Sequence, residues 1–552
     1  MQSFVMIITI LMLIILLPAL IGWGFLAEQV FRFKIFHGIS GKIFCGTFSV
    51  SVFLTIIAFF SGITVYAEGI ILGIGILFFF REKFYLNLYS FLKNSGFGFL
   101  STAMVCIICA SFYPFILDHF GYYVPTIKWI SEFGLIRGIS NLDLTLGQMS
   151  VWHLFQAGFS HLADPFLRIN VLIAIAYLVY IFENKSWIHL AFFPALFFFL
   201  QSPSPDLPVY IFSLIIVHEV FIKTKIDSGL LAFSIFIFSI KPTMIWLPVF
   251  VVLNMILRKE ISFKVLIPGL IVLSIFVFKN FWVFGYPVFP LTLFDLNLPW
   301  KPNPELMNES SQYAVLKTYD AQYSLEQIKS FTTKEKVVNW LFISGIKSFF
   351  NTGLILFLFF YIIFTFAVKQ KTHYILLGSL FLKTVLILSF SAQYRFFLEI
   401  FPVIFIAVFY TYNLKKIYVT IFSAGSFAAV SFFINPEILK YLIPSFRPGG
   451  TMGKFEISQL YQPKEYFPTE FNSFKVGNLK FHVSKKYPFN YETPTPAISE
   501  GFMFDYQRLG IFPQLKNPDR IKSGFVWKKL DSKRKTELDN AIKVIKNNYQ
   551  QP

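Results

Sequence analysis

Residues 4–21 read FVMIITILMLIILLPALI, an apolar run without a single charged side chain. A helix needs roughly 20 such residues to cross the hydrocarbon core of a bilayer. No basic residue precedes the run and no small-residue cleavage pattern follows it, as a secretory signal would require. We therefore interpret the run as a retained membrane span.

The rest of the chain has the same apolar character. Of its 552 residues, 55% are hydrophobic, 74 are Phe and only 14% are charged, and the mean hydropathy is +0.62. These values exclude an ordinary soluble globular protein. The net charge of +18 comes from Lys and Arg that are dispersed among loops and the tail. We therefore expect contact with anionic membrane lipids and no nucleic-acid partner.

Cysteine and histidine spacing predicts neither disulfides nor a metal site. The three cysteines, Cys45, Cys106 and Cys109, all lie in apolar segments. Ala157 stands one helical turn after His153, where a zinc site would need a second imidazole. We therefore predict no metal ligands, and the use of a divalent metal as a cofactor stays open.

Along the chain, about fourteen segments, including this first run, are apolar and long enough to be candidate membrane spans. They lie near 4–22, 43–61, 64–80, 97–117, 169–182, 186–200, 207–222, 229–240, 243–257, 265–284, 351–368, 374–391, 397–411 and 416–434. The segments around Pro208 and Pro242 are also compatible with broken or re-entrant helices, which would change the count by about two. The sequence predicts an all-α polytopic membrane bundle over residues 1–434.

Basic residues are concentrated in alternate short loops, as the positive-inside rule expects of cytoplasmic loops. The loops after the first, third, seventh and ninth segments each carry Lys or Arg. They can all be cytoplasmic only if the N-terminus is outside. The loops predicted to face outward are then 118–168, 202–206, 241–242, 285–350 and 391–396.

Two outward regions have structure of their own. Within 118–168, apolar residues recur at helical spacing over 124–133 and 151–162, which predicts two amphipathic helices lying in the membrane interface. The tail, 435–552, is predicted to be a small α+β domain outside the cytoplasm. It has strand-like runs near 471–483 and a surface-helix pattern over 532–548.

Unusual polar residues end several spans on the predicted outer side. Asp118 directly follows the fourth segment, where a carboxylate can take a proton from an acceptor hydroxyl, although it could equally cap the next helix. Arg395 follows the twelfth segment, where a guanidinium can hold phosphate oxygens, although it could equally snorkel to the interface. Their common side of the membrane favours the functional interpretation.

Other polar residues repeat this placement. Asp206, Lys241 and the Lys279-Asn280 pair also lie at outer ends of spans, where interfacial anchoring is the alternative explanation. Lys383 differs because apolar residues flank it on both sides, near the middle of a span. An ionisable residue there indicates a functional site and requires a polar cavity or an acidic partner.

Three segments give the chain a likeness to a known superfamily. They are Asp118-His119-Phe120-Gly121-Tyr122-Tyr123; Lys279-Asn280 with Gly285-Tyr286-Pro287-Val288-Phe289-Pro290 and Pro299-Trp300-Lys301; and Gln393-Tyr394-Arg395-Phe396. In order and predicted outer location they resemble the GT-C superfamily of integral membrane glycosyltransferases, and specifically a family of large bacterial membrane proteins with that architecture.

This resemblance implies a GT-C-like bundle in the bacterial cytoplasmic membrane. It implies transfer of a sugar from a polyprenyl-phosphate donor to a glycan, lipid or protein acceptor, with Asp118 as base. Many GT-C enzymes carry this acid after the first span, and here it follows the fourth. Together with the polar residues above, the substrate-binding candidates are His119, Tyr122, Asp206, Lys241, Lys279, Asn280, Lys383 and Arg395.

Two other function classes remain open at this point. An O-antigen polymerase or ligase would use related lipid-linked chemistry, but it would normally carry more arginines in its outer loops. A lipid or solute transporter would show inverted repeats and broken helices at mid-membrane. We find no such repeat, and Lys383 is the residue that favours a transporter.

Overall fold

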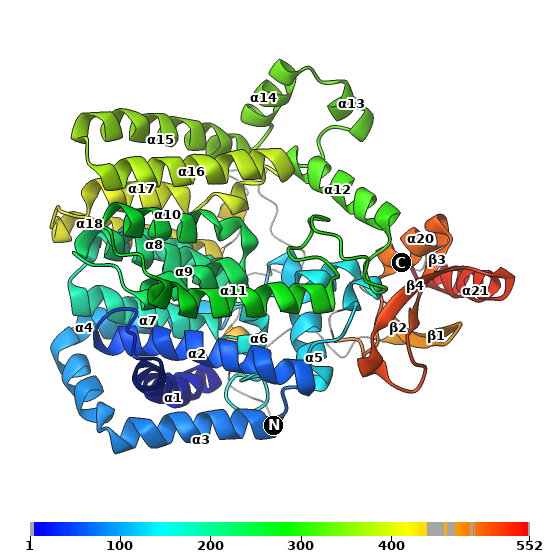
Figure 1. Ribbon diagram of the computed structural model, residues 1–552, viewed down its shortest axis with the longest axis horizontal. Coiled ribbons are helices and arrows are strands. Elements are labelled where there is room, and N and C mark those ends of the chain that lie inside the picture. Colours follow the sequence, from blue (N-terminus) through cyan, green and yellow to red (C-terminus); the bar gives the residue numbers. More distant parts are fainter. Residues whose placement is uncertain are drawn as a thin grey trace.

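Long apolar helices dominate the protein, and a small unit of strands and helices lies at one end of their bundle (Figure 1). The computed structural model describes residues 5–435, 437–438, 457–460, 470–485, 489–490 and 492–549. Residues 439–456 and 461–469, which the sequence assigned to the start of the tail domain, lie outside the described residues.

Helices form in all of the segments that the sequence predicted as spans. The bundle contains α1 (Val5–Phe31), α2 (Gly38–Phe60), α3 (Val65–Arg81), α4 (Phe84–Ala110), α7 (Asn170–Asn184), the 3₁₀ helix η4 (Trp187–Phe199), α8 (Asp206–Ile222), α9 (Ser228–Ile240), η5 (Pro242–Met244), α10 (Trp246–Leu257), α11 (Phe263–Val283), α15 (Ile346–Val368), α16 (Lys371–Phe390), α17 (Ile400–Phe409) and α18 (Lys415–Ile434).

Seven helices in the described part of the chain are long and apolar enough to cross a membrane, namely α1, α2, α4, α11, α15, α16 and α18. Further apolar helices are shorter, among them α7, η4, α9 and α17. Most residues of α7, α9 and α17 are buried, because neighbouring helices cover them. The chain is therefore a helical membrane protein.

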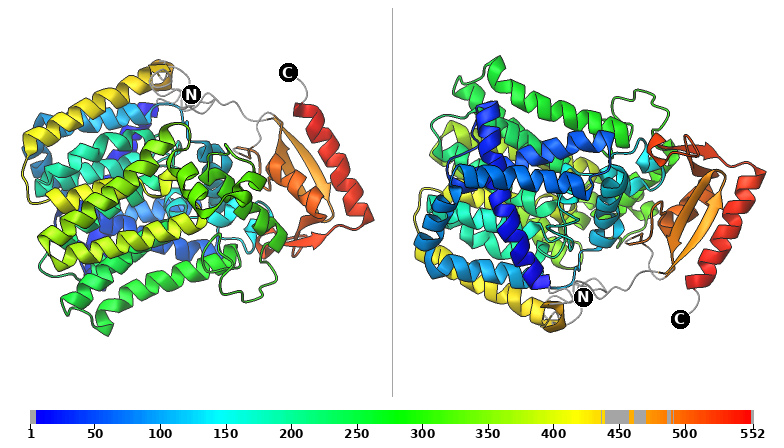
Figure 2. Two further views of the ribbon diagram at one scale, coloured as in Figure 1. Left: turned by 90° about the horizontal axis from the view of Figure 1, so that it is seen from above. Right: turned by 90° about the horizontal axis from the view of Figure 1, so that it is seen from below.

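Glycines let the first three helices pack at backbone contact. A Cβ at Gly24 of α1 would overlap the carbonyl oxygen of Lys42 in α2, and a Cβ at Gly22 would overlap that of Gly75 in α3. Small residues at such crossings allow membrane helices to gain van der Waals contact along their length. This three-helix layer forms one side of the bundle (Figure 2).

Helix α4 consists of two parts that meet at Gly96. The backbone there has a φ of 67°, which breaks the helix. The sequence predicted a span only from residue 97, so the first part, 84–95, is a helix where a loop was expected. Its polar residues, such as Asn87 and Asn94, interrupt the apolar pattern that the prediction required.

The loop 118–168 folds into the protein. It contains η1 (His119–Tyr123), α5 (Val124–Phe133), η2 (Ile139–Asn141), η3 (Leu144–Gln148) and α6 (Val151–Ala157). The two predicted helices are present. A lipid-facing position is wrong for α6, whereas α5 keeps partly exposed residues and its position in the interface stays a prediction. All seven residues of α6 are buried, because α6 packs against α2 and α5 and so has no face left for lipid.

Three short helices follow α11 in the second long loop. They are α12 (Pro304–Thr318), α13 (Leu325–Ser330) and α14 (Thr333–Leu341). Trp340 of α14 is buried, and its indole N–H donates a hydrogen bond to the Ala392 carbonyl at 2.9 Å. This contact holds the turn between α16 and α17, in which the short helix η6 (Tyr394–Phe396) lies.

Among the described residues, the C-terminal unit contains two antiparallel hairpins and two α-helices. Its elements are β1 (Phe471–Val476), β2 (Leu479–Ser484), α20 (Glu500–Leu509), β3 (Ile511–Leu515), the 3₁₀ helix η8 (Ile521–Ser523), β4 (Phe525–Lys529) and α21 (Ser532–Tyr549). The short 3₁₀ helix η7 (Ile457–Leu460) contacts α1 of the bundle instead. The strand and surface-helix predictions for 471–483 and 532–548 are confirmed.

The C-terminal unit is joined to the loop 118–168 through buried polar contacts. Asp143 is fully buried, and its carboxylate accepts hydrogen bonds from Ser499 at 2.6 Å and Asn490 at 3.3 Å. The backbone N–H of Phe525 donates to the carbonyl of Arg137 at 2.9 Å. Loop and unit therefore pack as one body at this end of the bundle (Figure 2).

Candidate active site

Asp118 is paired with Arg395. Its carboxylate makes no capping hydrogen bond to η1, and its Oδ2 instead accepts a hydrogen bond from Arg395 Nη1 at 2.7 Å. The capping interpretation of Asp118 is therefore wrong. Arg395 likewise has a specific partner, which the snorkelling interpretation did not foresee. The two side chains are 26% and 37% exposed, so molecules from outside the fold can reach them.

A second ion pair lies beside the first. Asp206, the first residue of α8, is bound to Lys241, which directly follows α9. The ammonium of Lys241 is also 4.9 Å from the ring centre of Phe396, the neighbour of Arg395. We call Asp118, Arg395, Asp206 and Lys241 the two-pair cluster.

The charges of this cluster act on one another. Burial by itself would lower the pKa of Arg395, but the negative charges of Asp118 and Asp206 outweigh it and raise the pKa above its ordinary value. Arg395 is therefore a permanent cation. Its Nε has no hydrogen-bond partner among the described residues, although it is buried. An anionic group can reach the guanidinium only through the exposed part of the side chain, which is 37% accessible.

Lys383 has the acidic partner that the sequence could not identify. Its ammonium forms an ion pair with Glu399, and the two side chains are only 1% and 7% exposed. Lys383 also lies within the electrostatic influence of Lys241 and Asp206. Sequence reasoning missed Glu399. The available signal was an acid directly before the apolar run of α17.

Tyr122 and His119 lie on η1 next to Asp118. Burial, together with the negative charge of Asp118, raises the pKa of Tyr122, so its hydroxyl stays protonated. His119 Nδ1 is 3.2 Å from the Ser202 hydroxyl, in the turn that leads into Asp206. The η1 segment and the start of α8 are thus tied together, and this connection positions both acids of the two-pair cluster.

Lys279 and Asn280 have other partners. The Lys279 ammonium donates to the Met149 carbonyl at 2.5 Å, and the Asn280 amide donates to the Pro287 carbonyl at 2.7 Å. Both side chains are buried. The structure therefore gathers seven of the nine candidates, namely Asp118, His119, Tyr122, Asp206, Lys241, Lys383 and Arg395. Lys279 and Asn280 instead hold the loops that surround the bundle end.

In the part of the chain that the structure describes, no group of three or more His, Cys, Asp or Glu side chains is placed as metal ligands would be. The acids of the two-pair cluster are each neutralised by a basic side chain. The chemistry available there is proton transfer and the binding of an anion.

A family model described as a domain of unknown function, DUF8201, matches residues 6–402. The chain belongs to this family. The DUF8201 match contains every candidate residue and Glu399, and it ends early in α17. The C-terminal unit lies beyond the DUF8201 match. No curated protein and no solved structure matches the chain.

Proposed function

We propose that this DUF8201 protein is a membrane glycosyltransferase of the GT-C type. It moves a sugar from a polyprenyl-phosphate donor to an acceptor hydroxyl at the outer face of the bacterial cytoplasmic membrane. The observation that supports this most directly is the ion pair of Asp118 and Arg395 beside that of Asp206 and Lys241. It provides one base and two cations at a single accessible place.

Asp118 serves as the general base. The acceptor oxygen forms a bond to C1 of the sugar as the bond between C1 and the phosphate oxygen breaks. The hydroxyl proton passes to the Asp118 carboxylate, and the bonding electrons leave with the polyprenyl phosphate. Attack from the side opposite the phosphate inverts the configuration at C1. Every atom and charge in this transfer is accounted for by donor, acceptor and Asp118, without a metal ion.

Arg395 and Lys241 hold the phosphate. A sugar phosphodiester carries one negative charge, and the departing monoester gains a second, so nearby cations stabilise the transition state more than the ground state. Phosphate binding at the exposed part of Arg395 weakens the ion pair between Arg395 and Asp118. Donor binding therefore frees the carboxylate for the acceptor hydroxyl, which couples base activation to the presence of donor.

The arrangement across the membrane is part of this proposal. About fourteen spans place the two-pair cluster and the C-terminal unit on the outer side. The proximity of the loop 118–168 to the C-terminal unit supports a shared side for both. The C-terminal unit then lies on the side from which the acceptor approaches the two-pair cluster.

The test is sugar transfer in proteoliposomes that contain the purified full chain and a radiolabelled polyprenyl-phosphate sugar. Asp118→Asn keeps the size of the side chain and removes the base, and we expect it to lower turnover by a factor of about 100 or more. The matched control is Asp295→Asn, an exposed acid that pairs with Lys301 in another loop. Full activity of Asp118→Asn at normal membrane abundance would remove the catalytic assignment.

The buried pair of Lys383 and Glu399 favours a second candidate, a proton-coupled transporter. Paired ionisable groups inside a helical bundle are characteristic of proton relays. Uptake of a solute or lipid driven by a proton gradient, lost in Lys383→Met and retained in Asp118→Asn, would support this function over sugar transfer.

A further inference from the structure

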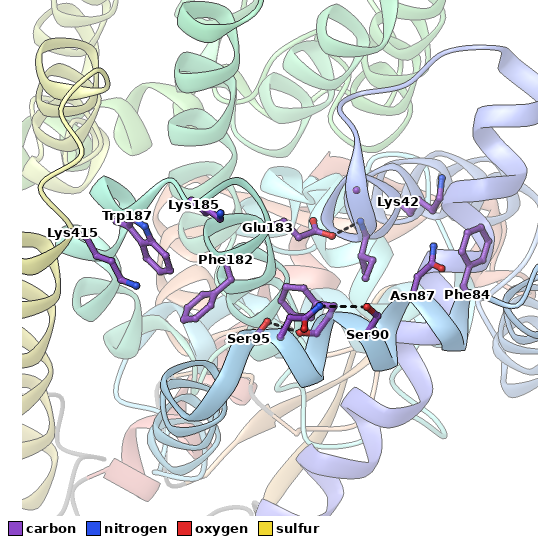
Figure 3. A pocket seen from close by; sticks show the side chains of 14 residues that line it. Lys42, Phe84, Asn87, Ser90, Ser95, Phe182, Glu183, Lys185, Trp187 and Lys415 are labelled. Atoms are coloured by element: carbon purple, nitrogen blue, oxygen red, sulfur yellow. Dashed lines mark hydrogen bonds between the residues drawn. The ribbon is translucent and has the colours of Figure 1, made fainter.

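A cavity of about 760 Å³ lies at the other end of the bundle from the two-pair cluster. Helix α17 leads away from Arg395, and Lys415, which lines the cavity, begins the next helix at its far end. The first part of α4, the end of α7 and the starts of α2, η4 and α18 form the walls (Figure 3).

The charge in this cavity is positive. Its one acid, Glu183, accepts hydrogen bonds from the backbone N–H groups of Ile39 and Ser40 at 2.7 and 3.0 Å, so it caps α2. Among the described residues, neither Lys185 nor Lys415 is paired with a carboxylate. The Lys415 ammonium lies 4.1 Å from the Trp187 ring centre, which holds it at the cavity wall.

Neutral hydrogen-bonding groups face the same space. Asn87, Ser90, Asn94 and Ser95 all line the cavity from the first part of α4 (Figure 3). The spacing of Asn87, Ser90 and Asn94 by three and four residues places them on one face of that helix, and Ser95 lines the cavity beside them. Amide and hydroxyl groups in this arrangement can bind phosphate oxygens and the hydroxyls of a polar headgroup.

An apolar surface continues from the cavity along the bundle. Phe91, Phe182 and Trp187 contribute aromatic walls. Beyond the break at Gly96, Phe97 is 84% exposed and Leu100 is 55% exposed on the second part of α4. A molecule with a charged head and an apolar tail would contact both regions at once.

We infer that this cavity binds the headgroup of an anionic phospholipid. Lys185 and Lys415 attract the phosphate, the α4 amides and hydroxyls bind the headgroup, and the acyl chains lie along the second part of α4. Basic pockets between membrane helices are suited to such lipids. The inference uses none of the residues of the two-pair cluster, so it does not depend on the proposed function.

The test is native mass spectrometry of the full chain released from micelles that contain phosphatidylglycerol or phosphatidylcholine. We expect at least one phosphatidylglycerol to be retained in preference to phosphatidylcholine. The double variant Lys185→Gln/Lys415→Gln should bind it about tenfold more weakly. The matched control is Lys369→Gln/Lys371→Gln, which removes two exposed lysines at the same end of the bundle but outside the cavity.

A second measurement places the lipid. Phosphatidylglycerol with brominated acyl chains should quench the fluorescence of the natural chain more than that of Trp187→Phe. Equal retention of phosphatidylcholine, or an equal loss in the control variant, would overturn the inference, because either result indicates a general basic surface. Displacement of phosphatidylglycerol by inorganic phosphate alone at millimolar concentration would also overturn it, in favour of a site for free phosphate.

Discussion

Lys383 and Glu399 show how a costly polar residue is accommodated inside an apolar bundle. Each side chain would be strongly destabilising alone, and their pairing offsets much of the cost of burial. We expect Lys383→Met to lower the free energy of unfolding by about 3–5 kcal/mol, because Glu399 is left without its counter-ion. Thermal or denaturant unfolding in detergent measures this effect.

The matching double variant separates pairing from packing. Lys383→Met/Glu399→Gln removes both charges, so it should recover most of the lost stability. The comparison also needs the single variant Glu399→Gln. If the double variant loses as much unfolding free energy as the two single variants together, the side chains do not interact directly.

Asp164 makes the stability of the loop 118–168 depend on pH. Burial raises the pKa of Asp164 to about 7, although the Arg168 backbone N–H and the Arg168 charge act in the opposite direction. The unfolded chain loses this proton near pH 4, so between about pH 4 and pH 7 the folded state binds more protons and stability falls as pH rises.

Asp164→Asn should abolish this dependence. The natural chain should lose up to about 4 kcal/mol of stability between pH 4 and pH 7 through this group, and the variant should lose none of it. Unfolding midpoints of both proteins across that range provide the measurement. Parallel curves would show that Asp164 does not titrate there.

The sequence predicted that Asp118 and Arg395 lie at the same end of the bundle, which their contact confirms, but it did not predict that they pair. Asp118 and Arg395 each follow an even-numbered apolar segment. Because consecutive spans cross the membrane in opposite directions, the count placed both residues on the same side. That Asp118 contacts Arg395 and that Lys383 contacts Glu399 depends on how the helices pack in three dimensions. A single sequence carries no signal for that packing.

Among the helices, apolar character was the reliable signal. Every predicted segment contains a helix, but only seven of the described helices reach the length that a span needs, so the number of spans stays a prediction. The apolar periodicity of α6 led to the wrong prediction that one face of this helix contacts lipid. The pattern shows one apolar face, but it does not show that neighbouring elements also cover the other face. Periodicity also missed the first part of α4, whose Asn and Ser residues line a cavity.

The crossing of α1 with α2 gives a test of helix packing. Gly24→Ala places a methyl group against the Lys42 backbone, so the helices must separate, and we expect a loss of about 1–3 kcal/mol in stability. Gly73→Ala is the matched control, since a Cβ there meets no atom within 4 Å. Equal unfolding midpoints for the two variants would contradict close packing at this crossing.

For the chain as a whole, the decisive measurement is which loops are accessible from outside. Single cysteines at Thr292, Lys371 and Lys480 occupy exposed positions in the second long loop, at the start of α16 and in β2. The three native cysteines are buried, so they contribute little background. We expect a membrane-impermeant thiol reagent on intact cells to label Thr292→Cys and Lys480→Cys but not Lys371→Cys.

The reverse labelling pattern would invert the orientation. The two-pair cluster would then face the cytoplasm, away from lipid-linked sugars at the outer face. The proposed glycosyltransferase activity would lose its basis, whereas the cavity at the other end would still be able to bind phospholipid from the opposite leaflet.

Arg395 follows Asp118 by 277 residues in the chain, yet the two side chains meet. During synthesis the aspartate is therefore inserted long before the ribosome has made its counter-ion. A nascent chain halted before residue 395 therefore carries the carboxylate of Asp118 without the cation that balances it in the finished fold. The two ends of this ion pair can meet only after most of the helical bundle has been made.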